Sequence, residues 1–417
     1  MAERFIIRGG RPLRGDVAVS GSKNAALYTL AAALLSADAV TIRNVPEIAD
    51  IGEMADVCRS LGAEIEIDGT TVQVQAREFS STAPPTDLVM ALRASFLVLG
   101  PVLARAGEAA CASPGGDVIG VRPLDVHLAG FRALGAEVHR SGAEWVARAS
   151  KLTGARIFLD YPSVLGTVNV MFAASLAEGT TTIVNAAAEP EVEMAASMLN
   201  SMGGRITGHG TAIMKIEGVE RMHGTDFTVI PDRIEAGTYL LAGIATGGDL
   251  RVTNAEPAQL DSLLTKFREL DAEVEIGEGG GVRVACPRRL RPIQVQAVPY
   301  PGFPTDLHAP MATALTQVPG VSTIHERVFD NRTLYVGELR NLGAKIITGG
   351  QTVIVEGGGR LNGANVRALD IRAGAAVMIG GLAADGETEV SGIEHLDRGY
   401  AHLAERLEAV GADVERA

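Results

Sequence analysis

Basic residues, aromatic residues and cysteine are all scarce in this sequence. Lys and Arg total 37 against 50 Asp and Glu, so the formal net charge is −13. This charge argues against a surface that binds nucleic acid or an anionic membrane, because both need a basic excess. An anionic ligand must therefore be held by a local cluster of Arg and Lys. Aromatic residues make up 4% of the chain and Gly numbers 49, so the core must pack aliphatic side chains with backbones close together.

The three cysteines, Cys58, Cys111 and Cys286, are odd in number and widely separated. This pattern is typical of unpaired thiols in a reducing compartment. The eight histidines have no spacing that would bind a metal. The N-terminus lacks an apolar signal region, and no apolar run reaches the ~18 residues that a membrane span needs. We therefore expect a cytoplasmic protein with no membrane segment.

One four-residue motif recurs six times along the 417 residues. Its second position falls at 62, 135, 203, 271, 343 and 411, which are 73, 68, 68, 72 and 68 residues apart. Each copy follows a helical pattern and precedes an alternating strand pattern, so its small residues predict a helix C-cap and a tight turn. The copies are Leu61–Glu64, Leu134–Glu137, Met202–Arg205, Leu270–Glu273, Leu342–Lys345 and Val410–Asp413.

Two further recurring motifs define the rest of the repeat. The first occurs at Thr41–Asn44, Thr182–Asn185 and Arg251–Asn254. The second occurs at Leu13–Val17, Leu152–Arg156 and Leu361–Asn365. One repeat is therefore a strand, a helix, a strand, a helix and strands, about 70 residues long. Because solenoid repeats are shorter, at about 20 to 50 residues, we expect closed bundles instead of an open array.

Six repeats divide most naturally into two domains of three, which suits a chain of this length. The segment Phe5–Val19 precedes the first helix, so we interpret it as the closing strand of a repeat whose other parts lie near the C-terminus. The predicted domains are then discontinuous. Residues 21–231 form one, and residues 1–20 with 232–417 form the other. The fold class is α/β.

The stretch from Ser113 to Pro123 combines glycines with a proline near each end, a composition typical of a hinged lid. It also carries a carboxylate, Asp117, and a guanidinium, Arg122. Such a loop suits a site that closes over a negatively charged substrate and then moves a proton. An ordinary surface turn with solvated charges has the same composition, and these residues alone favour that alternative.

Cations recur where a closing strand meets the next helix. Lys23 and Arg93 are 70 residues apart, and arginines follow at positions 233 and 372. Free N–H groups and the helix dipole attract anions there, so Lys or Arg beside them predicts a phosphate or carboxylate site. For Arg233 we favour a structural salt bridge with Asp232 or Asp370.

Two more segments carry charges of interest. Phe303–Leu307 places Asp306 behind a proline at the same corner of its repeat, and Asp397-Arg398 lies where a loop enters the last helix. Taken singly, each is more often an N-cap or a solvated charge than a catalytic group. The Asp397-Arg398 pair could also be a local salt bridge.

Together these motifs resemble those of the enolpyruvyl transferases, and the resemblance covers the whole chain. The matching segments are Gly21–Ala26, Pro114–Pro123, Pro304–Asp306, Phe329–Arg332 and Asp397–Tyr400. The resemblance implies an inside-out α/β barrel-like fold of two domains with three repeats each. It also implies transfer of enolpyruvate from phosphoenolpyruvate to the 3-hydroxyl of UDP-N-acetylglucosamine, the first committed step of peptidoglycan synthesis. That reaction releases phosphate by addition and then elimination, without a metal or another cofactor.

The resemblance also assigns roles to residues. Asp306 accepts the proton of the attacking hydroxyl, and Asp117 occupies the place of the proton donor. The cations that hold phosphoenolpyruvate are Lys23, Arg122 and Arg398, with Arg332 and Arg372 nearby. The residues that line the nucleotide-sugar site are Asn24, Arg93, Arg122, Pro123, Leu124, Asp125, Val126, Tyr161, Ser163, Val164 and Val328. Clustered cations suit a highly charged substrate whose charge moves during the addition.

Two positions depart from the family pattern. Many members carry Cys where this chain has Asp117. A thiol with a reference pKa of about 8.5 keeps its proton at neutral pH, whereas a free Asp at about 3.9 does not. Burial would raise the pKa of Asp117, and nearby arginines would lower it. We expect Asp117→Cys to move the pH–rate profile, and we expect the epoxide fosfomycin, which alkylates the usual thiol, not to inactivate this protein. Near Tyr161 the family commonly has a Lys, whose loss weakens contact with the diphosphate.

Two other functions compete with this one. The related transferase that acts on shikimate 3-phosphate usually has Ser after the motif Lys and an Arg further along that helix, whereas Asn24–Leu27 follows here. A nucleotide-sugar sensor could keep the fold without catalysis, but a binder has no need of Asp306 as a base. Phosphate release from phosphoenolpyruvate, measured with each acceptor, separates the three.

Overall fold

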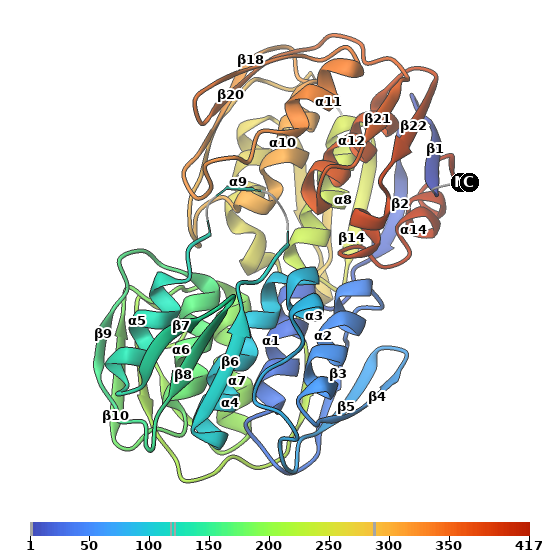
Figure 1. Ribbon diagram of the computed structural model, residues 1–417. Coiled ribbons are helices and arrows are strands. Elements are labelled where there is room, and N and C mark those ends of the chain that lie inside the picture. The colour runs from blue at the N-terminus through green and yellow to red at the C-terminus, as the bar shows by residue number, and fades with distance from the viewer. Residues whose placement is uncertain (1–2, 117–118, 121, 287–288) are drawn as a thin grey trace. The chain divides into compact units, whose positions relative to one another are not determined.

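The computed structural model describes residues 3–116, 119–120, 122–286 and 289–417. The chain forms two compact units, drawn in Figure 1. Among the described residues, the N-terminal unit comprises 21–116 and 122–230, and the C-terminal unit comprises 3–20, 119–120 and 231–417. The predicted domains, 21–231 and 1–20 with 232–417, run close to these limits, except that residues 119–120 group with the C-terminal unit.

The predicted repeat is clearest between residues 294 and 357. Its elements are β17 (Gln294–Ala297), η4 (Thr305–Leu307), α10 (His308–Leu315), β18 (Gly320–Glu326), α11 (Tyr335–Asn341), β19 (Lys345–Gly349) and β20 (Thr352–Gly357). Strand β17 is parallel to β18, and the hairpin of β19 and β20 returns so that β20 is antiparallel to β18. The predicted succession of strand, helix, strand, helix and strands is confirmed here.

Two more four-stranded sheets complete the C-terminal unit. Their elements and the helices between them are β1 (Arg4–Arg8), β2 (Arg14–Ala18), α8 (Arg233–Ala245), β14 (Asp249–Thr253), η2 (Pro257–Leu260), α9 (Asp261–Glu269), β15 (Glu273–Ile276), η3 (Glu278–Gly280), β16 (Val282–Ala285), β21 (Asn365–Arg367), α12 (Ile371–Ala383), β22 (Glu387–Ser391), α13 (Glu394–Asp397), α14 (Leu403–Ala409) and β23 (Val414–Arg416). The strand orders are β15-β16-β14-β2 and β21-β22-β1-β23. In each sheet one edge strand, β2 or β21, is parallel to its neighbour, and the other pairs are antiparallel.

The N-terminal unit repeats this plan. Its elements are α1 (Lys23–Ala33), β3 (Val40–Arg43), α2 (Ala49–Ser60), β4 (Glu64–Asp68), β5 (Thr71–Gln75), α3 (Thr86–Ala91), η1 (Arg93–Val98), α4 (Leu99–Ala106), β6 (Glu108–Ala112), α5 (Asp125–Ala133), β7 (Glu137–Ser141), β8 (Glu144–Arg148), β9 (Arg156–Phe158), α6 (Val164–Ala174), β10 (Thr180–Val184), α7 (Pro190–Ser201), β11 (Arg205–Thr207), β12 (Ile213–Glu217) and β13 (Asp226–Thr228). Two sheets have the orders β13-β3-β5-β4 and β11-β12-β10-β9. The third, β6-β8-β7, has three strands in the described part of the chain.

The expectation of a single strand over Phe5–Val19 is wrong. Two strands occupy this segment and belong to different sheets, because β1 pairs with β22 and β23 whereas β2 pairs with β14. Glycine causes the break. Gly10 has a φ of 78°, and a Cβ at Gly9 would lie 2.0 Å from the carbonyl oxygen of Gly381. Strand β1 therefore closes the last repeat, and β2 opens the repeat that contains α8.

Asparagine ends a strand at three equivalent places, which explains why the motif at Thr41–Asn44 recurs at Thr182–Asn185 and Arg251–Asn254. Asn44, Asn185 and Asn254 have φ values of 58°, 61° and 54°, a left-handed conformation that Asn tolerates well. Each side-chain amide donates to a carbonyl oxygen just past the end of the neighbouring parallel strand. The acceptors, at 2.8 to 2.9 Å, are Val229, Leu159 and Val19. The recurring asparagine thus holds the end of the neighbouring parallel strand, the strand that leads into the next helix.

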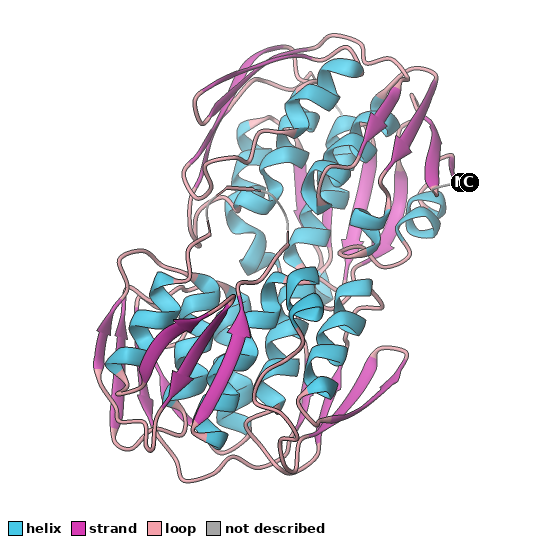
Figure 2. Cartoon of the chain, in the orientation of Figure 1, coloured by secondary structure: helices cyan, strands magenta, loops and turns pink. Residues whose placement is uncertain are grey.

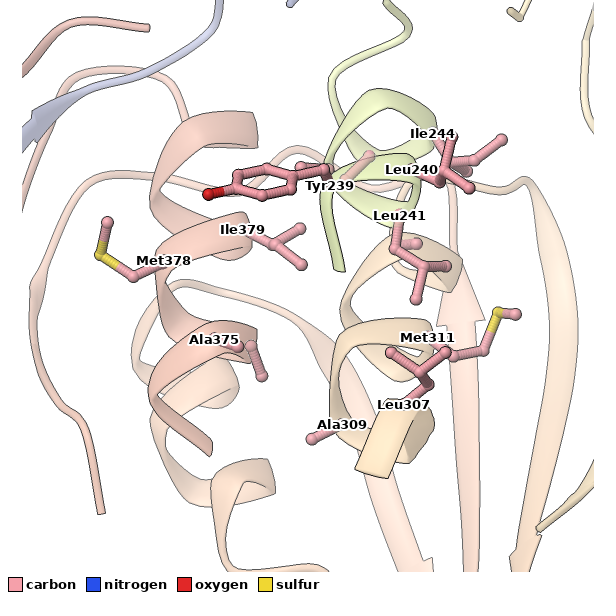
Figure 3. Close-up of a cluster of buried hydrophobic side chains, with 14 of the residues drawn as sticks. Tyr239, Leu240, Leu241, Ile244, Leu307, Ala309, Met311, Ala375, Met378 and Ile379 are labelled. Carbon is pink, nitrogen blue, oxygen red and sulfur yellow. The ribbon is translucent and has the colours of Figure 1, made fainter. Parts of the chain in front are cut away.

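Helices lie inside each unit and strands lie on its outside, as Figure 2 shows. In the C-terminal unit α8, α10 and α12 pack on one another, and Figure 3 shows Leu241, Met311 and Ile379 among their buried side chains. Nearly every residue of these helices is buried, so they have no polar face. The backbones are close, since a Cβ at Gly237 would lie 2.4 Å from the Leu307 side chain. None of the helices in the described ranges is long and apolar enough to span a membrane.

Candidate active site

Three predicted site residues meet in the C-terminal unit around the carboxylate of Asp306. Its Oδ1 accepts a hydrogen bond from Nη2 of Arg332 at 2.6 Å, and its Oδ2 accepts one from Nη2 of Arg372 at 2.9 Å. The two arginine side chains are 4% and 8% exposed, whereas that of Asp306 is 24% exposed. One partly accessible carboxylate is therefore held between two buried cations.

The three members of this cluster come from the short helix before α10, the first turn of α12 and the loop after β18. Asp306 lies in η4, directly before α10. Arg372 is the second residue of α12, and the N-cap Asp370 accepts two backbone N–H bonds, one of them from Arg372. Arg332 follows β18, and its guanidinium carbon lies 5.6 Å from the centroid of the Phe329 ring. The cationic helix start predicted from the sequence is present at Arg372.

The two arginines dominate the electrostatics of Asp306. Burial would raise its pKa, but the charges of Arg372 and Arg332 outweigh burial and hold the pKa well below its ordinary value. Asp306 is therefore ionised at neutral pH, and it is a weak base while both arginines face it. Among the described atoms, Nε of Arg332 is buried without a hydrogen-bond partner, so an anionic group could satisfy it.

Other charges that the sequence singled out in this unit have different surroundings. Arg233 begins α8, and its guanidinium carbon lies 5.6 Å from the centroid of the Tyr300 ring, while Asp232 caps the same helix. Asp397 forms a salt bridge with Arg416 at 2.7 Å. Arg398, the predicted ligand of phosphoenolpyruvate, is half-buried and directly follows the short helix α13 instead of entering α14.

Glu326, at the end of β18, ties two parts of the candidate site together. It is fully buried. Its Oε2 accepts the hydroxyl of Thr305 at 2.8 Å, and its Oε1 accepts the backbone N–H groups of Val328 at 2.7 Å and Phe329 at 3.2 Å. Thr305 precedes Asp306, and Val328 is a predicted nucleotide-sugar residue. One buried carboxylate thus holds the segment that leads into Asp306 and the segment that contains Val328.

Lys23 begins α1 in the N-terminal unit, behind its N-cap Ser22. Its Nζ lies 2.7 Å from Oδ2 of Asp50 in α2, and the two side chains are 9% and 1% exposed. The helix is otherwise buried, but the predicted ligand Asn24 is partly exposed. An anion that binds Lys23 therefore has to share it with Asp50.

Arg93, at the start of η1, holds both ends of the predicted lid. Its Nη1 donates to the carbonyl oxygen of Pro114 at 3.4 Å, and its Nη2 donates to the carbonyl oxygen of Arg122. The backbone is close, because a Cβ at Gly116 would lie 3.0 Å from Cβ of Arg93. Burial and the charge of Arg122 lower the pKa of Arg93 to about 10, which leaves it charged at neutral pH. In this unit Arg93 is a clamp on the backbone of the loop.

The middle of the predicted lid is described at Ile119 and Gly120, and it groups with the C-terminal unit. The carbonyl oxygen of Ile119 accepts the N–H of Asn331 at 3.2 Å. Gly120 has a φ of 120°, and a Cβ there would lie 3.2 Å from the backbone nitrogens of Asp330 and Asn331. Asp117, the predicted proton donor, lies outside the described residues.

The other predicted nucleotide-sugar residues of the N-terminal unit lie on two neighbouring segments. The hydroxyl of Tyr161 donates to Oδ1 of Asp125 at 2.9 Å, and burial together with Asp125 raises the pKa of Tyr161 to about 12. Ser163 caps α6 by accepting the N–H of Gly166, and a Cβ at Gly166 would lie 2.6 Å from Val126. The same segments contain the rest of this set, Pro123, Leu124 and Val164.

A histidine is buried beside an arginine in each unit. His127 places Nδ1 3.1 Å from the amide nitrogen of Asn169, and His308 places Nδ1 3.2 Å from the hydroxyl of Tyr335. Burial, followed by the charge of the neighbouring arginine, lowers the pKa of both histidines to about 3. Both are neutral at physiological pH, so neither supplies an acid. Within the described residues, no group of three or more His, Cys, Asp or Glu side chains is arranged to hold a metal ion.

The three cysteines are unpaired, as predicted. Burial raises the pKa of Cys58 to about 12 and that of Cys286 to about 11, and it also raises the pKa of Cys111. A thiol reacts as its thiolate, so none of the three has the character of a reactive nucleophile.

The sequence matches the family EPSP synthase (3-phosphoshikimate 1-carboxyvinyltransferase) over residues 7–407. This chain belongs to that family. The predicted enolpyruvyl transferase resemblance is confirmed, and the chain is an enzyme of this family by descent.

Two curated relatives in the EPSP synthase family are similar along nearly their full length. UDP-N-acetylglucosamine 1-carboxyvinyltransferase 2 of Carboxydothermus hydrogenoformans is 46% identical over 415 residues, which are 99% of each chain. UDP-N-acetylglucosamine 1-carboxyvinyltransferase of Desulfosudis oleivorans is 45% identical over 414 residues, again 99% of each chain.

Solved structures of the same family share the fold. The enolpyruvyl transferase NikO from Streptomyces tendae has a TM-score of 0.89 at 26% identity, over 100% of this chain and 99% of that one. EPSP synthase from Acinetobacter baumannii has a TM-score of 0.76 at 17% identity over the whole of both chains, a likeness of fold alone. The predicted α/β fold class, an inside-out arrangement with repeated sheets, is confirmed.

Sequence reasoning missed three buried polar residues, Asp50 beside Lys23 in the N-terminal unit and Glu326 and Tyr400 in the C-terminal unit. Asp50 falls in helical register with Ile51 and Met54, and Glu326 alternates with Ile324, so each carboxylate shares a face with apolar residues. That placement is a usable signal of a buried charge. Tyr400 stands in a matched motif, but the motif drew attention only to Arg398.

Proposed function

We propose that this chain transfers the enolpyruvyl group of phosphoenolpyruvate to the 3-hydroxyl of UDP-N-acetylglucosamine and releases phosphate. The observation that carries the proposal is Asp306 between Arg332 and Arg372, a base and two anion-binding groups within one partly open cluster. Relatives at 45 to 46% identity that carry this activity in their names support the acceptor.

In this proposal, Asp306 gains basicity when phosphoenolpyruvate binds. The phosphate or carboxylate of the substrate takes up N–H groups of Arg332 and Arg372, and its negative charge offsets the two cations. Because those cations hold the pKa of Asp306 low, the pKa rises toward its ordinary value. The carboxylate can then accept the proton of the sugar hydroxyl.

The addition and the elimination each need one proton transfer at carbon. The sugar oxygen forms a bond to C2 of phosphoenolpyruvate while its proton passes to Asp306, and an acid protonates the methylene carbon. Elimination removes a proton from that methyl group, restores the double bond and breaks the bond between C2 and the phosphate oxygen. We assign the acid to Asp117 from its place in the sequence, with Lys23, Arg122 and Arg398 as further cations for the substrate.

The nucleotide-sugar residues remain part of the proposal. The residues assigned to this ligand are Asn24, Arg93, Arg122, Pro123, Leu124, Asp125, Val126, Tyr161, Ser163, Val164 and Val328. Neighbouring placement of Tyr161, Asp125 and Ser163 supports a common surface, and Glu326 holds Val328. Within the cell, we place the reaction in the cytoplasm as the first committed step of peptidoglycan synthesis.

The test is phosphate release from phosphoenolpyruvate with each of two acceptors. We expect release with UDP-N-acetylglucosamine and background release with shikimate 3-phosphate. Shikimate 3-phosphate is included as the second acceptor because the description of the matched family names a 3-phosphoshikimate transferase. Release with shikimate 3-phosphate alone would reassign the chain, and release with neither acceptor would favour a nucleotide-sugar sensor.

A further inference from the structure

The hydroxyl of Tyr400 lies behind the guanidinium of Arg372. Tyr400 is 2% exposed, its oxygen lies 3.1 Å from Nη1 of Arg372, and its ring centroid lies 5.7 Å from the guanidinium carbon. Nη2 of the same arginine donates to Oδ2 of Asp306 at 2.9 Å. One guanidinium therefore joins the tyrosine to the carboxylate.

The direction of every proton in this chain of hydrogen bonds can be deduced. Oγ1 of Thr238 lies 2.8 Å from the carbonyl oxygen of Ile234, which can only accept, so Thr238 donates its single proton there. Thr238 must then accept from Tyr400, whose oxygen is 3.0 Å away. Burial raises the pKa of Tyr400, so the hydroxyl keeps the proton it donates. The lone pairs of the Tyr400 oxygen are left for Arg372.

We propose that Tyr400 is a positioning residue that holds the Arg372 guanidinium against Asp306, and thereby sets the strength of Asp306 as a base. The proposal rests on the proposed function, in which Asp306 takes the proton of the acceptor hydroxyl. Tyr400 acts through Arg372. Without its oxygen, a buried N–H of Arg372 lacks an acceptor and the guanidinium turns toward other partners.

The two arginines of the cluster are held differently. Arg332 lies over Phe329, which offers a ring but no oxygen, whereas Arg372 lies over Tyr400, which offers both. A Tyr400→Phe change therefore gives Arg372 the same kind of aromatic support that Arg332 has. It removes the acceptor of the Arg372 N–H and the donor to Thr238, and it leaves the ring.

Several charges bear on Asp306 and limit the size of the effect. Arg332 binds Oδ1 from the segment after β18, and Arg233 at the start of α8 also lowers the pKa of Asp306. On the other side, Asp232 acts on Arg372, and Asp370 accepts the backbone N–H of Arg372. Loosening Arg372 alone should therefore raise the pKa of Asp306 only in part.

The first test is the pH dependence of kcat at saturating phosphoenolpyruvate in Tyr400→Phe, since the limbs of kcat report the enzyme with substrate bound. We expect kcat at neutral pH to fall about tenfold, the order of one lost hydrogen bond to a charged group. We also expect the acidic limb to move to higher pH by roughly half a unit, because Asp306 loses part of a neighbouring positive charge.

The matched control is Tyr335→Phe. Tyr335 is equally buried, but its hydroxyl contacts His308 and not Arg372. The control should leave the acidic limb in place. An unmoved limb in Tyr400→Phe, or the same movement in both variants, would overturn the proposal.

A second test needs no substrate. In an unfolding cycle, Tyr400→Phe should destabilise the wild-type chain more than an Arg372→Leu background, because the background has already lost the bond to Arg372 and only the bond to Thr238 remains to be lost. Equal losses in both backgrounds would refute the link between Tyr400 and Arg372. If the wild type releases no phosphate with UDP-N-acetylglucosamine, the proposed function fails, and this cycle still decides whether Tyr400 holds Arg372.

Discussion

In the C-terminal unit, Arg332 and Arg372 both donate to one partly exposed carboxylate, whereas in the N-terminal unit Lys23 is paired with the buried Asp50 and Arg93 holds two backbone carbonyls. The units share a repeated architecture, and Lys23 and Arg372 both lie at the start of a central helix. The partners of each cation, and not its place in the repeat, therefore decide what it can do.

This difference separates a carboxylate shared by two cations from a cation and a carboxylate that pair with each other. Two cations that share a carboxylate with 24% exposure leave hydrogen-bond capacity for an anionic substrate. A buried pair with one cation and one carboxylate is closer to neutral, and its main consequence is the cost of breaking it. The predictions below test this contrast, from the largest expected effect to the smallest.

The largest effect should come from removing the base. Asp306→Asn keeps the shape but cannot take a proton, so kcat should fall by a factor of about 10² to 10⁴, the usual contribution of a general base. Steady-state phosphate release measures it. The matched control is Asp249→Asn, because both carboxylate oxygens of Asp249 also accept arginine N–H groups, here from the single residue Arg283 away from the cluster. Full activity in Asp306→Asn would show that the carboxylate is only a structural partner of the arginines.

The same carboxylate makes stability depend on pH in a defined direction. The folded-state pKa of Asp306 is depressed, so its contribution to the free energy of unfolding is present above the ordinary pKa of about 3.9 and is lost as the pH falls below it. Asp306→Asn should therefore flatten the loss of stability on acidification. Denaturant unfolding at a series of pH values measures the slope, and equal slopes for wild type and variant would contradict the expected pKa.

Breaking the buried pair of the N-terminal unit should act on stability. Asp50→Asn leaves a buried Lys23 without its carboxylate, and the free energy of unfolding should fall by about 3 to 5 kcal/mol. Denaturant unfolding at neutral pH measures the loss. Glu108→Gln is the control, because its partner Arg148 forms an exposed pair that solvent screens. Equal stability of the two variants would mean that Asp50 does not hold Lys23.

A smaller loss should follow from Glu326→Ala, which leaves the N–H groups of Val328 and Phe329 without their acceptor. We expect a fall of roughly 2 kcal/mol in the free energy of unfolding and a higher KM for the nucleotide sugar. Glu326→Gln is the matched variant, since its amide can still accept both N–H groups and donate to the hydroxyl of Thr305. A Gln variant as impaired as the Ala variant would point to a need for the charge itself.

The smallest expected effect is a shift of the pH–rate profile on replacement of Asp117, the assigned proton donor. Asp117→Cys should move the limb of the pH–rate profile that reports the proton donor to higher pH, because the ordinary pKa of a thiol exceeds that of a carboxyl. The variant should also become sensitive to fosfomycin in a time-dependent manner, while the wild type stays active. Two of the three native thiols are buried and the third, that of Cys286, is partly buried; burial raises the pKa of all three, so none is a favoured site of alkylation. Inactivation of the wild type would argue against this account.

The sequence predicted the repeat well because the signals of its elements are local. A helix cap, a tight turn and an alternating strand are written in adjacent residues, as in Leu61–Glu64. The prediction of one strand over Phe5–Val19 was wrong because Gly9 and Gly10 divide the segment between two sheets, whose other strands are far away in the chain.

The candidate site was less predictable, for a physical reason. Arg93 and Arg372 occupy equivalent-looking positions, but one binds backbone carbonyls and the other binds a carboxylate and a tyrosine. Those partners are brought in by tertiary packing, and no spacing in the sequence distinguishes them. Asp50 and Glu326 likewise gain their roles only from residues that packing places beside them.

The most direct measurement of the account is the fate of the oxygen that bridges carbon and phosphorus in phosphoenolpyruvate. With oxygen-18 at that position and UDP-N-acetylglucosamine as acceptor, enolpyruvyl transfer breaks the bond between carbon and oxygen, so the label should leave in phosphate. Recovery of the label in pyruvate, with no new ether on the sugar, would mean cleavage at phosphorus and would contradict the proposed reaction.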